Sequence, residues 1–484
     1  MHCSILEGRG CQACKEDMQL AKKIQKLQER RQKLQTEMNE IHDPFVLKLP
    51  PELASYIFLL SMGRRDTREI PSRGDCLPTP FLLGAVCSGW RQLARSTPAL
   101  WTRLAFTLPD SKMREALPHL VADWLERSGG LPLTLRVSYC AIYGNPPPDR
   151  HGSVIDALNQ HSGRWCDVEF KFPSDYVGRL CGSSPPKYLR NLSISSDNDD
   201  ETDLPLTFSM NARPNPMKFK IFGFLLEGVD VAWDNLVHLD LNWTTFDGIL
   251  QIIRDAPLLE ICSLSFISPP MDDFRIPEII IRHPYLRTLQ LIVFLEQTSV
   301  FHRLINSLEL PSLESWSVEF VELEESPVVD IMTSFLKRSG CRLKTLNMEQ
   351  HHAPAVEDFE RFLQAVPYLQ HLHVACPPPY DRSLTPVMDN ILERISTSPA
   401  MQTRHTAVFL PDLQLLQLTG HKLNAWACIP LIFRLPHRKL LKVDISMCSV
   451  TIGDNVLEEL VELVDQGIEL DICDRSRGRA SRVI

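Results

Sequence analysis

The sequence predicts an α/β protein in which an N-terminal helical module precedes an irregular solenoid of alternating helices and strands with a curved parallel sheet. Two observations predict this fold class. Up to residue 106, apolar residues recur every three or four positions, which is the spacing of amphipathic helices. Beyond it, nine segments repeat one pattern of a leucine, two residues, an apolar residue, one residue and a second apolar residue. Most neighbouring copies lie about 23 to 30 residues apart, and two gaps are roughly twice as long, as expected for stacked repeats.

Length, charge and composition describe a chain that can bury large cores. It has 484 residues, 44% of them hydrophobic, and a net charge of −9. Charge or proline interrupts every long apolar run, so we expect no membrane span, and the acidic balance argues against a nucleic-acid partner. The polar N-terminus has no secretion signal, so we expect the 14 cysteines to be reduced thiols of a cytoplasmic and/or nuclear protein.

The first two segments are expected to be a short tail and a charged helix. Residues 1–14 form a flexible tail in which Cys11 and Cys14 make a single CxxC pair; structural zinc needs four ligands, so we expect free thiols and no metal. Residues 15–43 carry a heptad stripe with Arg31 at one seam position. The apolar members of the stripe are Leu20, Ile24, Leu27, Leu34, Met38 and Ile41. A lone or intramolecularly packed helix is favoured slightly, and a homodimer through residues 15–43 is the alternative.

Residues 46–106 are expected to form a module of three short helices. The first follows LPPELASYIF (49–58), with prolines at its start and Glu52 in its first turn. Its apolar stripe consists of Leu49, Leu53, Ile57 and Leu60. A second helix is expected through Val86, Trp90, Leu93 and Ala94, and Pro98 precedes a third apolar face with Leu100, Trp101 and Leu104. Residues 63–80 are polar and rich in proline and glycine, which predicts a surface insertion. Because three short helices bury little surface alone, such a module is expected to complete its core against a partner.

The module resembles the F-box, a short helical module that docks onto the small Skp-family adaptor of SCF ubiquitin ligases. The matching positions are Leu49, Pro50, Glu52, Leu53, Ile57, Phe58, Val86, Cys87, Trp90, Arg91, Leu93, Ala94, Pro98, Leu100 and Trp101. The insertion at 63–80 is longer than the family pattern. By position, the resemblance implies that the adaptor is bound by Leu49, Pro50, Leu53, Ile57, Val86, Trp90 and Leu100. The alternative is that these residues form the core of the module itself.

Residues 107–472 are expected to form the solenoid, and residues 473–484 a basic, disordered tail. Copies of the repeated pattern begin at Leu189, Leu236, Leu259, Leu286, Leu313, Leu343, Leu369, Leu413 and Leu440. Their period and apolar core resemble the leucine-rich repeat, without most of its asparagines. Helices are expected over 112–128, 151–161, 246–255, 329–339 and 356–366, and further strands over 131–137 and 165–172. The alternative is a set of αβ units in another layered fold.

In a solenoid of this kind the strands line a concave face, and residues between the apolar positions point into it. The resulting candidates for binding a target protein are His238, Asp240, Arg287, Gln290, Gln370, His373, Gln414 and Gln417, together with Glu314 and Ser317. They form a mixed polar set that suits the recognition of another protein, whose identity one sequence does not give.

Motifs for catalysis are missing from the sequence. There is no phosphate-binding loop, no GxSxG and no HExxH, and no nucleophile, base and orienting group occur together. His351 and His352 are expected to be an exposed loop pair and not a metal site. We therefore expect no enzymatic activity and no cofactor.

These features predict a non-catalytic substrate-recognition adaptor. The F-box would bind the Skp-family adaptor and through it a cullin ligase, and the repeats would bind an unknown target protein. The order of a cysteine-containing tail, a heptad helix, an F-box and divergent repeats is similar to that of fungal F-box proteins. The alternative is an F-box scaffold, or a protein that interacts through a coiled coil, outside a ligase.

Overall fold

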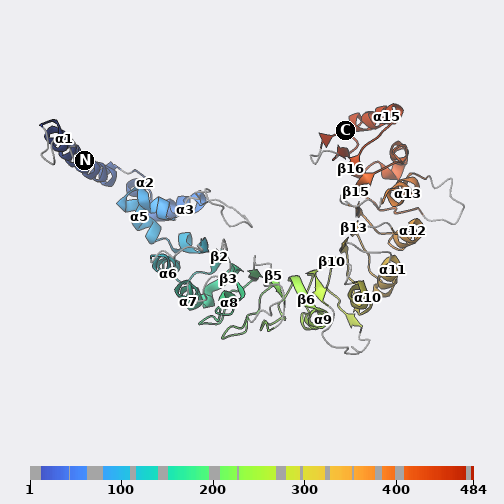
Figure 1. Ribbon diagram of the computed structural model, residues 1–484, viewed down its shortest axis with the longest axis horizontal. Coiled ribbons are helices and arrows are strands. Elements are labelled where there is room, and N and C mark those ends of the chain that lie inside the picture. Colours follow the sequence, from blue (N-terminus) through green and yellow to red (C-terminus); the bar gives the residue numbers. More distant parts are fainter. Residues whose placement is uncertain are drawn as a thin grey trace.

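Figure 1 presents the protein as a computed structural model, an open arc that begins with helices and continues as a solenoid. The structure describes residues 12–42, 44–62, 80–108, 116–139, 151–195, 208–225, 228–268, 280–294, 298–321, 328–350, 354–376, 384–397, 408–475 and 481–483. In the solenoid, the strands lie along the inner side of the arc and the helices along its outer side (Figure 1).

The N-terminal part of the arc is helical. Its elements are α1 (Gln12–His42), α2 (Pro44–Lys48), α3 (Pro51–Ser61), α4 (Pro80–Val86), α5 (Ser88–Arg95) and the 3-10 helix η1 (Pro98–Trp101). Helix α3 begins as the sequence predicts, with Pro50 as its N-cap, Pro51 as its first residue and Glu52 in its first turn. Proline suits this position because the first amide groups of a helix have no intrahelical acceptor.

The second helix expected through Val86, Trp90, Leu93 and Ala94 is in fact divided between α4 and α5. Cys87 separates them with an extended backbone, at φ −155°, and its Sγ accepts a hydrogen bond of 3.4 Å from the Trp90 amide. The sulfur therefore acts as the N-cap of α5. The apolar spacing continues across this break, which is why the sequence pattern alone predicts one helix.

One parallel sheet occupies the remainder of the arc. Its strands, in spatial order, are β1 (Arg103–Leu108), β2 (Leu133–Tyr139), β3 (Trp165–Lys171), β4 (Asn191–Ser195), β5 (Lys218–Leu225), β6 (His238–Thr245), β7 (Ile261–Ser265), β10 (Thr288–Phe294), β12 (Ser315–Val321), β13 (Thr345–Gln350), β14 (His371–Ala375), β15 (Leu415–Lys422), β16 (Lys442–Ser449) and β17 (Leu470–Asp474). Spatial order follows chain order throughout, so each unit contacts mainly its chain neighbours, which defines a solenoid.

Four further strands in the described part of the chain are short. At the C-terminal edge, β18 (Ser481–Arg482) pairs antiparallel with β17. Strand β8 (Ile267–Ser268) pairs with β6, and β9 (Ile281–Arg282) pairs with β11 (Leu308–Glu309) in a separate two-stranded sheet. The pairing of β18 differs from the disordered tail expected over 473–484, and β17 itself extends to Asp474.

Helices cover the outer face of the sheet. They are α6 (Leu117–Arg127), α7 (Gly152–Gln160), η2 (Ser162–Arg164), α8 (Ser174–Val177), α9 (Phe246–Asp255), α10 (Thr298–Asn306), α11 (Val328–Ser339), α12 (Val356–Gln364), α13 (Thr385–Ser396), α14 (Cys428–Phe433), η6 (Pro436–Arg438) and α15 (Asp454–Asp465). The core lies between the two layers: Trp316 of β12 is fully buried and meets Phe335 of α11 edge-on, with 5.1 Å between ring centroids. Burying this apolar surface is the main stabilising contribution to each repeat.

All nine predicted copies of the repeat coincide with strands, so the α/β class with a parallel-sheet solenoid is confirmed. The two long gaps have different origins. Strand β5 fills the first, whereas β14 pairs directly with β15 across the second, which contains α13. The sheet also begins earlier than expected, because β1 starts at Arg103, inside residues 46–106, which were assigned to the helical module.

Arginines at the boundary between units join consecutive repeats. Arg164, Arg338 and Arg438 each donate to main-chain carbonyls of the preceding unit, and Arg438 is 1% exposed. Two of these acceptors are carbonyls near the ends of α6 and α10, which lack intrahelical donors. The acceptors include Leu125 O at 2.8 Å, Ile305 O at 2.6 Å and Leu410 O at 2.7 Å. Burial lowers the pKa of Arg438 to about 10, which still leaves it charged at neutral pH.

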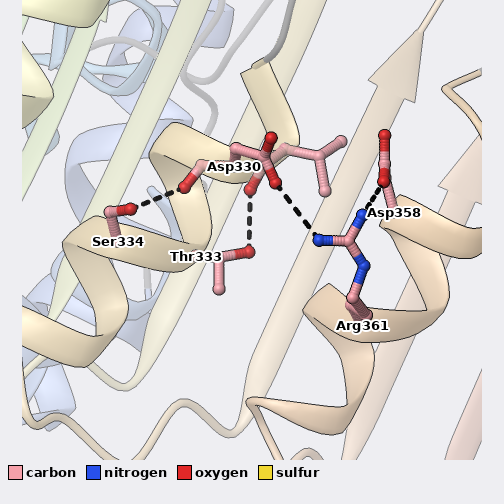
Figure 2. A network of polar contacts seen from close by, with 6 residues as sticks. Asp330, Thr333, Ser334, Asp358 and Arg361 are labelled. Carbon is pink, nitrogen blue, oxygen red and sulfur yellow. Dashed lines mark hydrogen bonds and ion pairs between the residues drawn. The ribbon is translucent and has the colours of Figure 1, made fainter.

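Ion pairs join neighbouring helices on the outer face. Figure 2 shows Arg361 of α12 between Asp330 of α11, at 3.8 Å, and Asp358 of its own helix. Arg394 of α13 pairs in turn with Glu360 of α12 at 2.9 Å. Because Arg361 is largely exposed, its pairs are expected to add little to stability.

The helical module and the first repeat share one aromatic cluster. Trp101 of η1 meets Trp124 of α6 with 4.9 Å between centroids, and Phe81 of α4 lies 5.4 Å from each. Arg127 lies over the Trp101 ring at 4.7 Å, and Trp101 donates to Ala94 O at 2.7 Å. Strand β1 begins only two residues after Trp101, so the module passes into the sheet without a linker.

Candidate interaction surfaces

Helix α3 carries apolar residues on two faces, of which one is buried. Ala54 and Phe58 lie in the core, and Phe58, 1% exposed, stacks on Phe45 with 5.4 Å between ring centroids. On the other face, Leu53 and Ile57 are 53% and 42% exposed. The stripe selected from the sequence is therefore mainly the face in contact with solvent.

The seven residues predicted to bind the adaptor fall into two groups. The exposed group consists of Pro50, Leu53, Ile57 and Val86. Leu49 and Trp90 are partly buried and pack against the core, and Leu100 is 1% exposed. The side chain of Leu100 therefore stabilises the module from inside and does not reach its surface.

Sequence reasoning missed further exposed apolar side chains on the same elements. These are Leu47 of α2, Tyr56 of α3, and Phe81 and Leu82 of α4. A helical wheel of α3 finds Tyr56 once Phe58 is assigned to the core, because a residue two positions away lies roughly 160° around the helix. The spacing of apolar residues does not identify Leu82 in the same way. Its helix, α4, begins directly after residues 63–79, which lie outside the described part of the chain.

Helix α1 has an uncovered apolar seam. Leu20, Ile24, Leu27, Leu34 and Met38 are all exposed, Leu27 by 66%. In this structure the seam does not lie along the helical module, so the expectation of intramolecular packing is not met by the described side chains.

The register of the sheet brings some of the predicted target-binding residues together. Asp240, Gln290, His373 and Gln417 lie in one row, in which each strand contributes the residue opposite its neighbour. His238 belongs to the row two residues earlier. Arg287, Gln370 and Gln414 do not join these rows, because each precedes its strand.

Polar contacts link neighbours along the central row. Lys220 and Asp240 form an ion pair of 2.8 Å, and Gln417 donates to Asp444 at 3.0 Å. Ser263 donates to Gln290 at 2.9 Å. The two other candidates, Glu314 and Ser317, lie just before and within β12, where Glu314 pairs with Lys344 at 3.2 Å.

Two thiols of the solenoid, the buried Cys262 of β7 and the partly buried Cys341 before β13, are unreactive. Burial raises the pKa of Cys262 to about 12 and that of Cys341 to about 11. A thiol with such a pKa is almost entirely protonated at neutral pH and is a poor nucleophile or metal ligand. Among the described residues, no three His, Cys, Asp or Glu side chains are arranged to hold a metal ion.

Several sequence predictions concern residues outside the described part of the chain. They include Cys11 of the CxxC pair, the pair His351 and His352, and residues 63–79 of the insertion; Pro80 is the first residue of α4. Within the described ranges, none of the helices combines the length and the apolar composition needed to cross a bilayer.

Comparison with known proteins finds structural similarity without sequence similarity. The sequence matches no family model and no curated protein. A solved structure described as a crystal structure of a TLR13–ssRNA13 complex is similar over 73% of this chain and 54% of that chain, with 13% sequence identity and a TM-score of 0.31. This chain thus spans about half the length of that one, and a TM-score of this size does not assign a fold. The repeated sequence pattern and the sheet order define the class of the protein, a leucine-rich-repeat-like α/β solenoid with a helical N-terminal part.

Proposed function

We propose that the protein is a non-catalytic substrate-recognition adaptor of an SCF-type ubiquitin ligase. The helical module acts as an F-box that binds a Skp-family adaptor subunit and through it a cullin ligase, and the solenoid binds a target protein. Tethering of this kind raises the effective concentration of the target near the ubiquitin-transferring enzymes, so the adaptor needs no chemistry of its own.

The exposure of the predicted docking residues is the observation that carries the proposal. Leu53 and Ile57 on α3 and Val86 at the end of α4 are each more than two-fifths exposed, although all three are large and apolar. Large exposed apolar side chains that lie one turn apart on a helix, as Leu53 and Ile57 do, mark interaction sites on soluble proteins. These three side chains are not part of the buried core, in which Phe58 packs against Trp90.

The proposal is tested by binding of a purified Skp-family subunit to the full chain, measured by titration calorimetry. Wild type is expected to bind, and the double variant Leu53→Glu, Ile57→Glu to bind about a hundredfold more weakly or not at all, because it places two charges in the apolar contact. Leu440→Glu is the matched control, since Leu440 is 90% exposed on the solenoid. Failure of wild type to bind, or equal binding by the double variant, refutes the docking function.

A second candidate function is supported by the uncovered seam of α1. The protein would then be a scaffold that dimerises through Gln12–His42 outside a ligase. One seam position of the heptad holds Leu20, Leu27 and Leu34, and the other holds Ile24, Arg31 and Met38. This arrangement favours a coiled coil of two helices, in which Arg31 is the destabilising residue. Sedimentation equilibrium tests it: dimerisation predicts a mass that rises with concentration and returns to that of one chain in Leu27→Glu, Leu34→Glu.

A further inference from the structure

Three aromatic rings stack across the carboxyl ends of neighbouring strands on the inner face of the sheet. Trp243 of β6 lies 4.4 Å from Phe266, which follows β7, and Phe266 lies 4.1 Å from Phe294 of β10, with ring planes within 17° of parallel. Phe266 has a left-handed backbone with φ 49°, which is uncommon for a bulky residue. All three rings are partly exposed, so they form a surface rather than a core.

Two carboxylates lie beside this aromatic row. Glu319 of β12 and Glu349 of β13 are directly opposite each other in register, and Phe294 is opposite Val321, two residues beyond Glu319. Their strand neighbours Val318, Phe320 and Met348 point into the core, so both glutamates face the inner side of the arc. Both are partly buried.

Other charged residues that face each other on this surface are compensated. Arg136 is opposite Glu169, and Lys220 is opposite Asp240. Where two acids face each other, at Asp444 and Asp471, each has another partner: Gln417 donates to Asp444 at 3.0 Å and Arg482 pairs with Asp471 at 3.1 Å.

Glu319 and Glu349 are the exception. Neither has a hydrogen bond or an ion pair with any described residue, and like charges directly opposite each other destabilise a sheet. The nearby His373 does not compensate them, because burial lowers its pKa and leaves it neutral at neutral pH, despite the opposing effect of Glu349. Among the described residues, these two facing carboxylates therefore have no compensating charge, and they lie next to an aromatic surface.

We propose that this surface binds an extended segment of the target protein that carries an arginine or lysine flanked by apolar residues. The aromatic row takes the apolar side chains and the stem of the basic residue, and the two carboxylates take its charged head. The same carboxylates repel a phosphate backbone, which selects a protein partner over a nucleic acid. This inference rests on the target-binding function proposed above, because it names the chemistry of the target.

The experiment uses the full chain and a fluorescein-labelled peptide, Gly-Ser-Leu-Ser-Arg-Ser-Leu-Ser-Gly. Alternate residues of an extended peptide face one side, so its arginine and leucines point the same way. Fluorescence anisotropy is expected to give saturable binding with Kd of about 100 µM or tighter for wild type. Glu319→Gln, Glu349→Gln is expected to weaken binding about tenfold or more, as is replacement of the peptide arginine by glutamine.

Two controls separate this surface from the rest of the protein. Asp330→Asn removes a carboxylate on the outer face that is already paired with Arg361, and is expected to leave peptide binding unchanged. Binding of the Skp-family subunit to Glu319→Gln, Glu349→Gln tests the docking function separately, and is expected to match wild type. The inference is wrong if wild type does not bind the peptide, or if the double variant or the glutamine peptide binds as tightly, whatever the outcome with the Skp-family subunit.

Discussion

Replacing Phe58 with alanine is expected to lower the free energy of unfolding of the helical module by about 3 to 5 kcal/mol. The magnitude follows from the surroundings of the ring, which is 1% exposed, stacks on Phe45 at 5.4 Å and lies 4.9 Å from the Trp90 ring. Truncation removes these contacts and leaves a cavity that the short helices close only in part. Urea unfolding followed by tryptophan fluorescence measures the change, since Trp90 reports on the site directly.

The matched variant is Leu53→Ala, on the same helix and similarly apolar. Because Leu53 is 53% exposed, its truncation is expected to change the free energy of unfolding by less than about 0.5 kcal/mol. The contrast between the two variants decides whether this stripe is a surface or a core. Equal costs for both would refute the assignment of α3 to a buried and an exposed face, and with it the argument for docking.

Three other substitutions test separate parts of the structure. Arg438→Met leaves the Phe409 and Leu410 carbonyls without their buried donor and should cost about 2 to 4 kcal/mol in urea unfolding; a cost below about 0.5 kcal/mol contradicts this role. Arg361→Ala removes only exposed ion pairs and should cost less than about 1 kcal/mol in the same assay, so a larger loss would mean that these pairs are not screened. Glu319→Gln should instead stabilise the free chain at neutral pH by about 0.2 to 1 kcal/mol, because it removes one of two facing charges. Burial, reinforced by the charge of Glu349, raises the pKa of Glu319. The gain in stability from Glu319→Gln is therefore present above that pKa and is lost as the pH falls through it. Urea unfolding at neutral pH and at about pH 4 checks this, and a gain that persists in acid would contradict it.

The repeats were predictable from the sequence because their signal is physical and recurs. Each copy must place two apolar residues, such as Leu289 and Leu291, in the core on alternate positions of a strand. This requirement does not depend on any binding partner, and it holds even where the number of residues between repeats varies. Strand β5 lacked the leading leucine of the pattern, so its Phe219 and Ile221 were not recognised as another copy.

The surfaces were less predictable. Helical spacing groups Leu53 with Ile57 correctly, but it does not say whether a stripe faces solvent or core, and for α3 that depended on the contacts of Phe58 with Phe45 and Trp90. The break at Cys87 depended on one sulfur accepting one amide, which apolar periodicity does not encode.

On the inner face, sequence reasoning considered only the residues between the apolar positions of each copy. Glu319 and Glu349 lie one position beyond the second apolar residue, so they were not chosen, although they face the same side as Ser317 and Asn347. These two acids face each other because of the register between β12 and β13, which only the structure reveals.

The packing of Trp101 on Trp124 joins the helical module directly to the first repeat of the solenoid. Trp101 and Trp124 pack together and β1 begins at Arg103, so the proposed docking function would place a partner on the helices next to the first strand of the sheet. Each further strand lies about 4.8 Å from the one before it, so adding or deleting one repeat between β1 and β10 would shift a bound segment by one such step and turn it by the twist of the sheet. The distance between the helical module and a given strand is therefore set by the number of repeats between them, in steps of one strand spacing.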